Sequence, residues 1–104
     1  MARVRWSPTG QQSLVDVAKY VVEQSQSLET SLKLIDAIEA KCETYAQFPH
    51  AGIPRNDLGE GRRCFAVGNY VVIYRPIDDG IRVIVVAHGH QDLYTMIRGI
   101  PESE

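Results

Sequence analysis

Two histidines and an aspartate alternate near the end of the chain, at His88, His90 and Asp92. They follow a β-branched run, so the end of a strand would present both imidazoles to one side. An imidazole titrates near neutral pH and is a candidate general acid or base. Asp92 would either orient one ring or cap a following helix, and we favour the cap. With no cysteine nearby, the pattern does not favour a metal site, and we predict neither a metal nor another cofactor.

Arginines form a second group of candidate functional residues. Arg62, Arg75 and Arg82 are expected to lie in a row across three strands, with Arg63 beside them. Guanidinium groups in such a row repel one another unless an anion lies between them. The row therefore predicts an anion-binding or carboxylate-binding role, and the alternative is that these charges only keep the strand ends soluble.

The stretch from residue 62 to residue 90 positions these side chains. The dipeptides Gly68-Asn69 and Asp79-Gly80 supply the positive φ that a tight hairpin needs. The flanking runs are β-branched and aromatic, which predicts three antiparallel strands. These strands are expected at about residues 62–67, 70–76 and 81–88.

The first half of the chain predicts a short strand and two helices. Val4 and Trp6 alternate with polar residues in the strand. Ser7 is an N-cap candidate for a first helix that ends near Glu23, and Ser27 is one for a second helix. A short polar link joins the two helices, so they are expected to form an antiparallel hairpin. Residues 48–54 predict a loop because they contain two prolines and a glycine.

Composition limits the class of protein. The chain has 104 residues, is 44% apolar and 23% charged, and carries a formal net charge of −2. We therefore predict one α+β domain over residues 1–104, ordered β-α-α-β-β-β, with both helices on one face of the sheet. The acidic end, about residues 99–104, is expected to be mobile. The negative charge disfavours direct nucleic-acid binding, and the lack of a signal peptide or membrane-spanning run predicts a cytoplasmic protein without membrane contact.

The two faces of the predicted sheet differ. One is aromatic, with Phe65, Tyr70 and Tyr74, and is expected to pack on the helices. The other has an apolar floor that two helices cannot also cover, so we expect a partner to bind there. Alternatively, the N-terminal strand, the tail or a second copy covers it. The floor consists of Ala66, Val71, Ile73, Ile84 and Val86.

Several short motifs follow one another at a characteristic spacing. They are Trp6-Ser7-Pro8, Phe48-Pro49-His50-Ala51-Gly52-Ile53-Pro54-Arg55, Val67-Gly68-Asn69-Tyr70, Ile73-Tyr74-Arg75 and His88-Gly89-His90-Gln91-Asp92-Leu93. In this order they resemble the RelE/ParE superfamily of toxins from type II toxin–antitoxin systems, and more closely its ParE-like, plasmid-stabilisation branch. The resemblance extends from about Val4 to Ile97. It implies a helical hairpin on an antiparallel sheet and a cognate antitoxin that wraps the hairpin and sheet.

The branch decides the expected activity. RelE-like members cleave mRNA with basic residues, yet Val71 and His90-Gln91 stand where that branch commonly has arginines. The resemblance therefore implies a ParE-like toxin that inhibits DNA gyrase by binding and is not itself an enzyme. The alternatives are a ribosome-dependent endoribonuclease and a degenerate toxin that only binds its antitoxin.

Each predicted role of the protein implies its own set of site residues. Expected target-binding residues are Arg55, Arg62, His88, His90, Gln91, Asp92 and Tyr94. Expected antitoxin-binding residues are Val71, Ile73, Arg75, Arg82, Ile84 and Val86. If the protein is an endoribonuclease, the candidate catalytic groups are Arg62, Arg75, His88 and His90.

Overall fold

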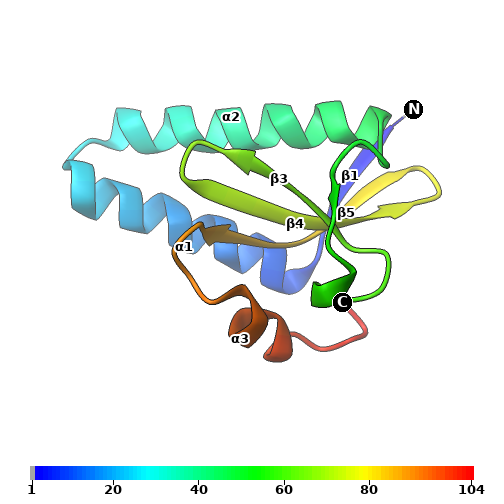
Figure 1. Ribbon diagram of the computed structural model, residues 1–104. Coiled ribbons are helices and arrows are strands. Elements are labelled where there is room, and N and C mark those ends of the chain that lie inside the picture. Colours follow the sequence, from blue (N-terminus) through cyan, green and yellow to red (C-terminus); the bar gives the residue numbers. More distant parts are fainter. Residues whose placement is uncertain (1) are drawn as a thin grey trace.

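The computed structural model describes residues 2–104 as two long helices against one sheet, with a third, short helix near the C-terminal end (Figure 1). The helices are α1 (Pro8–Ser25), α2 (Leu28–Gln47), the one-turn helix η1 (Asn56–Leu58) and α3 (Leu93–Arg98). The strands are β1 (Arg3–Trp6), β2 (Ile53–Pro54), β3 (Arg63–Val67), β4 (Tyr70–Ile77) and β5 (Gly80–His88). The sheet order is β1-β5-β4-β3-β2. The predicted α+β class, helical hairpin and central antiparallel meander are confirmed.

The helix starts follow from the predicted caps. The hydroxyl of Ser7 accepts from the Gly10 N–H at 2.9 Å, and that of Ser27 accepts from the Thr30 N–H at 3.1 Å. Gly10 stands where a capping box would have an acid, and a Cβ there would lie 2.7 Å from the Val83 carbonyl oxygen. The absence of a side chain therefore lets α1 approach β5 closely.

Two serines at the start of α1, the N-cap Ser7 and Ser13, form hydrogen bonds with the edge of β5 beyond the point where β1 ends. β1 pairs with β5 in parallel only as far as Val83. Beyond it, the Ser7 hydroxyl donates to the Ile84 carbonyl at 3.0 Å, and the Val86 N–H donates to the Ser13 hydroxyl at 2.8 Å. Backbone groups that would otherwise be buried without partners are satisfied, and α1 is fixed across the end of β5.

The aromatic face of the sheet packs on the helical hairpin, as predicted. The β3–β4 register pairs Val67 with Tyr70 and Phe65 with Val72. Phe65 stacks on Tyr45 of α2 with ring centroids 4.2 Å apart. Tyr74 is fully buried, and its hydroxyl donates to the Pro49 carbonyl and accepts from the Gly52 N–H.

The sheet has two edge strands that the sequence analysis did not include in it. β1 forms one edge, while β2 forms the other by pairing Ile53 with Cys64 and Pro54 with Arg63. The prediction that residues 48–54 are wholly loop is therefore wrong for Ile53 and Pro54. A two-residue strand leaves no periodicity to detect in the sequence.

The pairing of β4 with β5 contains a register shift and therefore differs from the pairing expected from simple alternation. Arg75 lies opposite Arg82 as predicted, but the shift between Ile73 and Tyr74 places Ile73 opposite Val85. The prediction that Val86 belongs to the apolar floor of the second face is therefore wrong, because Val86 faces the helices. One extra residue in a strand moves every following side chain to the other side.

The prediction that the second face is uncovered is also wrong. Ile73 and Ile84 are fully buried in a cluster with Leu58 and Ile100. The side chains of α3 complete this cover, so cover from the C-terminal part of the chain is confirmed. These side chains are Leu93, Met96 and Ile97. The alternative that the N-terminal strand covers this face is wrong, because β1 pairs with the edge of β5. At the hairpin end, Ala66 stays exposed and Val71 is half-buried.

The chain's last residues lie against the domain. Ile100 is buried, and Glu104 contacts α1 and the arginines of β4 and β5. Mobility of residues 99–104 and a single domain over residues 1–104 stay predictions. No helix within residues 2–104 has the length and apolar character needed to cross a membrane.

Both cysteines, Cys42 and Cys64, are free and buried. Burial, and then the charges of Glu39 and Glu43, raise the pKa of the Cys42 thiol to about 12. Such a thiol is inert at neutral pH.

Candidate functional site

A groove of about 600 Å³ lies at the C-terminal end of β5. Its walls are α1, the end of β5, the β5–α3 loop and α3. Asp16, Tyr20, His88 and His90 bring polar groups to a lining that is otherwise largely apolar. The apolar part is contributed by Val17, Tyr70, Val86 and Met96. We call this feature the histidine groove.

The two histidines are held by local contacts. The His88 ring meets Tyr70 edge-on at 5.2 Å and stacks on His90 at 4.9 Å between ring centroids. The His90 N–H donates to His88 Nδ1 at 3.2 Å, and the His88 N–H donates to Gln91 Oε1 at 2.7 Å. In the neutral ring this leaves the proton on Nε2 of His88. The prediction that both imidazoles are presented together is confirmed.

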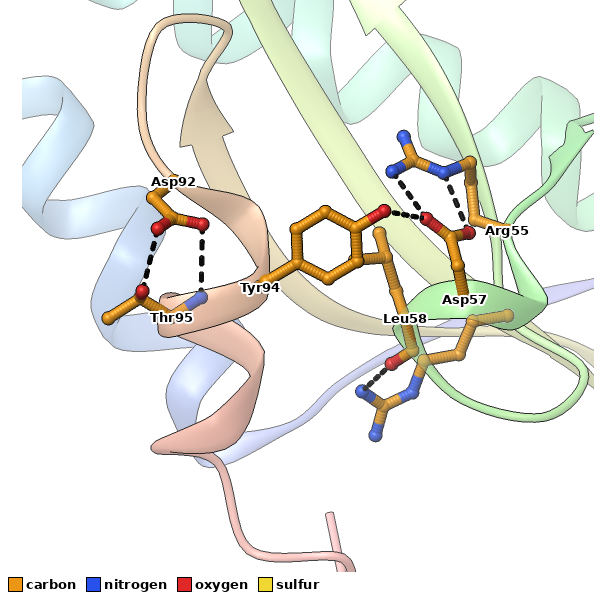
Figure 2. Close-up of polar contacts among 7 residues, drawn as sticks. Arg55, Asp57, Leu58, Asp92, Tyr94 and Thr95 are labelled. Carbon is orange, nitrogen blue, oxygen red and sulfur yellow. Dashed lines mark hydrogen bonds and ion pairs between the residues drawn. The ribbon is translucent and has the colours of Figure 1, made fainter.

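A second cluster pins α3 to η1 (Figure 2). Arg55 donates twice to the Asp57 carboxylate, at 3.0 and 2.9 Å, and the Tyr94 hydroxyl donates to Asp57 Oδ2 at 2.6 Å. Hydrogen bonding to Arg55, and then to Tyr94, holds the pKa of Asp57 well below its usual value. The same bonds raise the pKa values of Arg55 and Tyr94. We call this arrangement the Asp57 cluster.

Asp92 is the N-cap of α3 rather than a partner of the histidines. Its carboxylate accepts from the Thr95 N–H at 3.2 Å and from the Thr95 hydroxyl at 2.7 Å (Figure 2). These bonds, the hydroxyl's first, lower the pKa of Asp92. The cap that the sequence analysis favoured is confirmed.

Arginines gather in a third place, beside the C-terminal end of α3. A hollow of about 440 Å³ is lined by Arg62, Arg75 and Arg98, and Arg82 adjoins it through Glu104. Three acidic residues, Glu60, Glu102 and Glu104, also line it. Arg62 donates to the Leu58 carbonyl at 3.0 Å. Burial and then the charge of Arg75 lower the pKa of Arg62, and Glu102 opposes this. We call this hollow the arginine pocket.

The structure divides the expected target-binding residues among these places. His88, His90 and Gln91 meet at the histidine groove. Arg55 and Tyr94 meet in the Asp57 cluster. Arg62 lies in the arginine pocket, and Asp92 caps α3.

The candidate catalytic residues of the endoribonuclease reading do not converge. His88 and His90 line the histidine groove with Met96 of α3. Arg62 and Arg75 line the arginine pocket with Ile97 and Arg98 of the same helix. In the β4–β5 pairing His88 lies opposite Tyr70 at one end, and Arg75 lies opposite Arg82 toward the other end, so the two pairs do not form one site around a scissile bond.

The expected antitoxin-binding residues are also divided. Ile73 and Ile84 are buried and cannot contact a partner while α3 is in place. Val86 is buried on the other face, against the long helices, at the floor of the histidine groove. Val71 is half-buried, Arg82 is partly exposed and Arg75 is exposed.

Some residues of these sites were missed by sequence reasoning. Asp57 links Arg55 and Tyr94, two of the predicted residues. The one sequence feature that could have indicated its bond to Arg55 is that Asp57 lies two residues after it. Asp16 and Tyr20 lie one helical turn apart, and that spacing was the only indication that they share a wall with Ser13. Among residues 2–104, no cluster of three or more histidine, cysteine and acidic side chains has a geometry that would hold a metal ion.

Comparison with known families decides the identity of the fold. The profile of the family described as "ParE toxin of type II toxin-antitoxin system, parDE" matches residues 4–93. The chain belongs to the ParE toxin family. It is therefore a ParE-like toxin of the type II toxin–antitoxin class, and membership implies an antitoxin partner.

A solved structure agrees with the fold. The structure titled "Chromosomal ParDE TA system from P. aeruginosa" superposes with a TM-score of 0.70 at 17% identity, covering 85% of this chain and 96% of the other. No curated protein matches the sequence. At this identity, the likeness concerns the arrangement of helices and strands.

Proposed function

We propose that this ParE-family toxin inhibits DNA gyrase by binding it, in the cytoplasm, and that a cognate antitoxin neutralises the toxin. The histidine groove carries the proposal. It gathers His88, His90 and Gln91 over an apolar floor, and they are three of the residues expected to bind the target. A concave, mainly apolar surface with a few placed polar groups suits recognition of another protein.

Binding is favoured over catalysis by the separation of the basic groups. RNA cleavage needs one group to activate the 2′-hydroxyl and another to stabilise the charge that develops on the same phosphate. Here the candidate arginines and histidines lie toward opposite ends of the β4–β5 pairing and line different hollows. The half-buried Val71 adds no charge to either group.

The target-binding surface extends from the groove across α3. Tyr94 is 50% exposed and brings Arg55 and Asp57 into the same surface. Arg62 would reach the target only at the margin, because its guanidinium is bonded to Leu58. Asp92 would act indirectly, by holding the start of α3.

The antitoxin is proposed to lie along the helical hairpin. Leu28 and Leu32 are 64% and 54% exposed, one turn apart at the start of α2. Tyr20 of α1, which is also exposed, lines the histidine groove. A segment that folds as it binds would cover these residues together. Ile73 and Ile84 would join its surface only after α3 moves.

The experiment is a supercoiling assay with purified toxin, gyrase and relaxed plasmid, with a readout for cleaved DNA complexes. The wild type is expected to block supercoiling or trap breaks. His90→Ala is expected to weaken this effect about tenfold, in line with loss of one interface anchor. His50→Ala, an exposed histidine outside the groove, is the matched control and should behave as the wild type.

The alternatives give different results. Unaffected supercoiling at high toxin excess would contradict the gyrase proposal. In that case, mRNA cleavage in a translating extract, lost in His90→Ala, would establish the endoribonuclease. No activity in either assay would leave a protein that only binds its antitoxin.

A further inference from the structure

The arginine pocket already contains one peptide ligand, the chain's own last residues. The backbone oxygen of Glu104 accepts from Arg82 at 3.0 Å and from Arg75 at 3.2 Å. Its side-chain Oε1 accepts from the Thr9 N–H at 2.7 Å. Arg75 and Arg82 of the predicted row therefore lie together, the backbone oxygen of Glu104 lies against them, and its carboxylate lies against Thr9.

Three features make this a favourable seat for a glutamate. Thr9 is in the first turn of the 18-residue helix α1, whose free N–H groups and dipole attract an anion. Two arginines from adjacent strands bond the same residue. The bond from Thr9 lowers the pKa of the Glu104 carboxyl, which means that this position favours the charged form.

The lining of the pocket fits a peptide better than a nucleic-acid backbone. Leu58 and Ile97 lie beside the arginines and, with them, Ile100 of the tail is buried. The pocket thus already accommodates an apolar side chain, that of Ile100, four residues before the glutamate at position 104. The whole chain carries a net charge of −2, which opposes a polyphosphate.

We infer that the arginine pocket is a binding site for an acidic peptide segment of a partner protein, and that residues 100–104 occupy it in competition. A partner's glutamate would take the place of Glu104 between Thr9, Arg75 and Arg82. Because residues 100–104 are tethered to the pocket, they compete at an effective concentration on the order of millimolar. They would therefore exclude ligands that bind weakly and be displaced by ligands that bind tightly. The inference does not depend on gyrase as the target.

The test uses the full chain and a fluorescent peptide of sequence IPESE, the chain's own residues 100–104, in an anisotropy titration. Glu104→Ala removes the side-chain bond to Thr9 but keeps the backbone oxygen that both arginines bond, so the tail becomes a weaker competitor and this variant should bind the peptide roughly fivefold more tightly than the wild type. Glu104→Gln keeps an acceptor oxygen and should fall between them. Glu23→Ala, an exposed position in the last turns of α1, is the control and should match the wild type. Circular dichroism checks that each variant is folded.

Further arms locate the site and the ligand class. Arg82→Gln or Arg75→Gln in the Glu104→Ala background should weaken peptide binding about tenfold. The neutral peptide IPQSQ should bind at least tenfold more weakly than IPESE. Equal affinity of wild type and Glu104→Ala, or of the two peptides, would overturn the inference. So would displacement of the peptide by oligo-dT at a lower concentration than by unlabelled IPESE, since the pocket would then favour nucleic acid.

Discussion

The two faces of the sheet are covered in different ways. On one face, α1 and α2 supply 18 and 20 residues, and residues such as Ile38 and Cys42 are fully buried. On the other, α3 has six residues, none of which is itself buried. Yet the strand residues beneath it, Ile73 and Ile84, are as inaccessible as those beneath the long helices.

The difference indicates which cover opens first. The long hairpin is fixed by buried apolar contact and by serine bonds to β5. α3 depends on a few partly buried side chains, the Asp92 cap and the Asp57 cluster. Elements with few buried contacts open at lower free energy than the core. We therefore expect α3, which lines both the histidine groove and the arginine pocket, to be the adjustable part of the molecule.

The largest effect expected is loss of packing under the long helices. Ile38→Ala removes a side chain with no exposed surface and should lower the free energy of unfolding by about 2–5 kcal/mol. Ile97→Ala on half-buried α3 should cost no more than about 1.5 kcal/mol. Urea unfolding followed by circular dichroism measures both. Equal losses would contradict the distinction between the two covers.

A buried hydroxyl gives the next largest effect. Tyr74→Phe removes a donor to Pro49 and an acceptor for Gly52, so it should destabilise the protein by about 1–3 kcal/mol. Tyr20→Phe, on an exposed ring, is the control and should be close to neutral. A neutral Tyr74→Phe would mean that this hydroxyl does not anchor the loop.

A smaller and local effect is expected from the Asp57 cluster. Tyr94→Phe removes the 2.6 Å bond to Asp57 and should speed hydrogen exchange of the α3 amides severalfold. The amides of β4 should be unchanged. Equal acceleration in both elements would show that the cluster supports the whole fold rather than α3.

Low pH should weaken the Asp57 cluster and so reproduce part of the effect of Tyr94→Phe. The native pKa of Asp57 is lowered, so the unfolded state binds more protons, and the stability it contributes is present above the ordinary aspartate pKa of about 3.9. That stability is lost as the pH falls through the lower native pKa. The difference in unfolding free energy between wild type and Asp57→Asn should be constant from about pH 7 to 5 and shrink below about 4. Asp36→Asn, on the exposed face of α2, is the control.

Sequence reasoning succeeded where the pattern was local. Ser7, Ser27 and Asp92 are caps as expected, and the Gly68-Asn69 turn gave the β3–β4 register residue for residue. These features depend on neighbouring residues and on the chemistry of one turn. The stacking of His88 on His90 was expected from strand alternation, but β5 ends at His88 and His90 lies in the turn that follows, so the turn brings the two rings together.

It failed where one residue or one distant contact decided the outcome. The shift beside Ile73 has no sequence signal of its own, and it moved Val86 to the other face. The short apolar run of α3 did not reveal that it would cover Ile84. The bond between Arg55 and Asp57 joins near neighbours, but the bond from Tyr94 to Asp57 spans 37 residues, so no local pattern predicts that α3 is attached there.

Native-state hydrogen exchange across a series of low urea concentrations tests the central distinction most directly. If α3 is the adjustable cover, its amides exchange through a local opening with little urea dependence. The amides of β4, β5 and α2 then exchange only with global unfolding. Exchange of the α3 amides at the global free energy, with the full urea dependence, would contradict it. The two covers would then be one cooperative unit, and α3 would not be the part that adjusts to a partner.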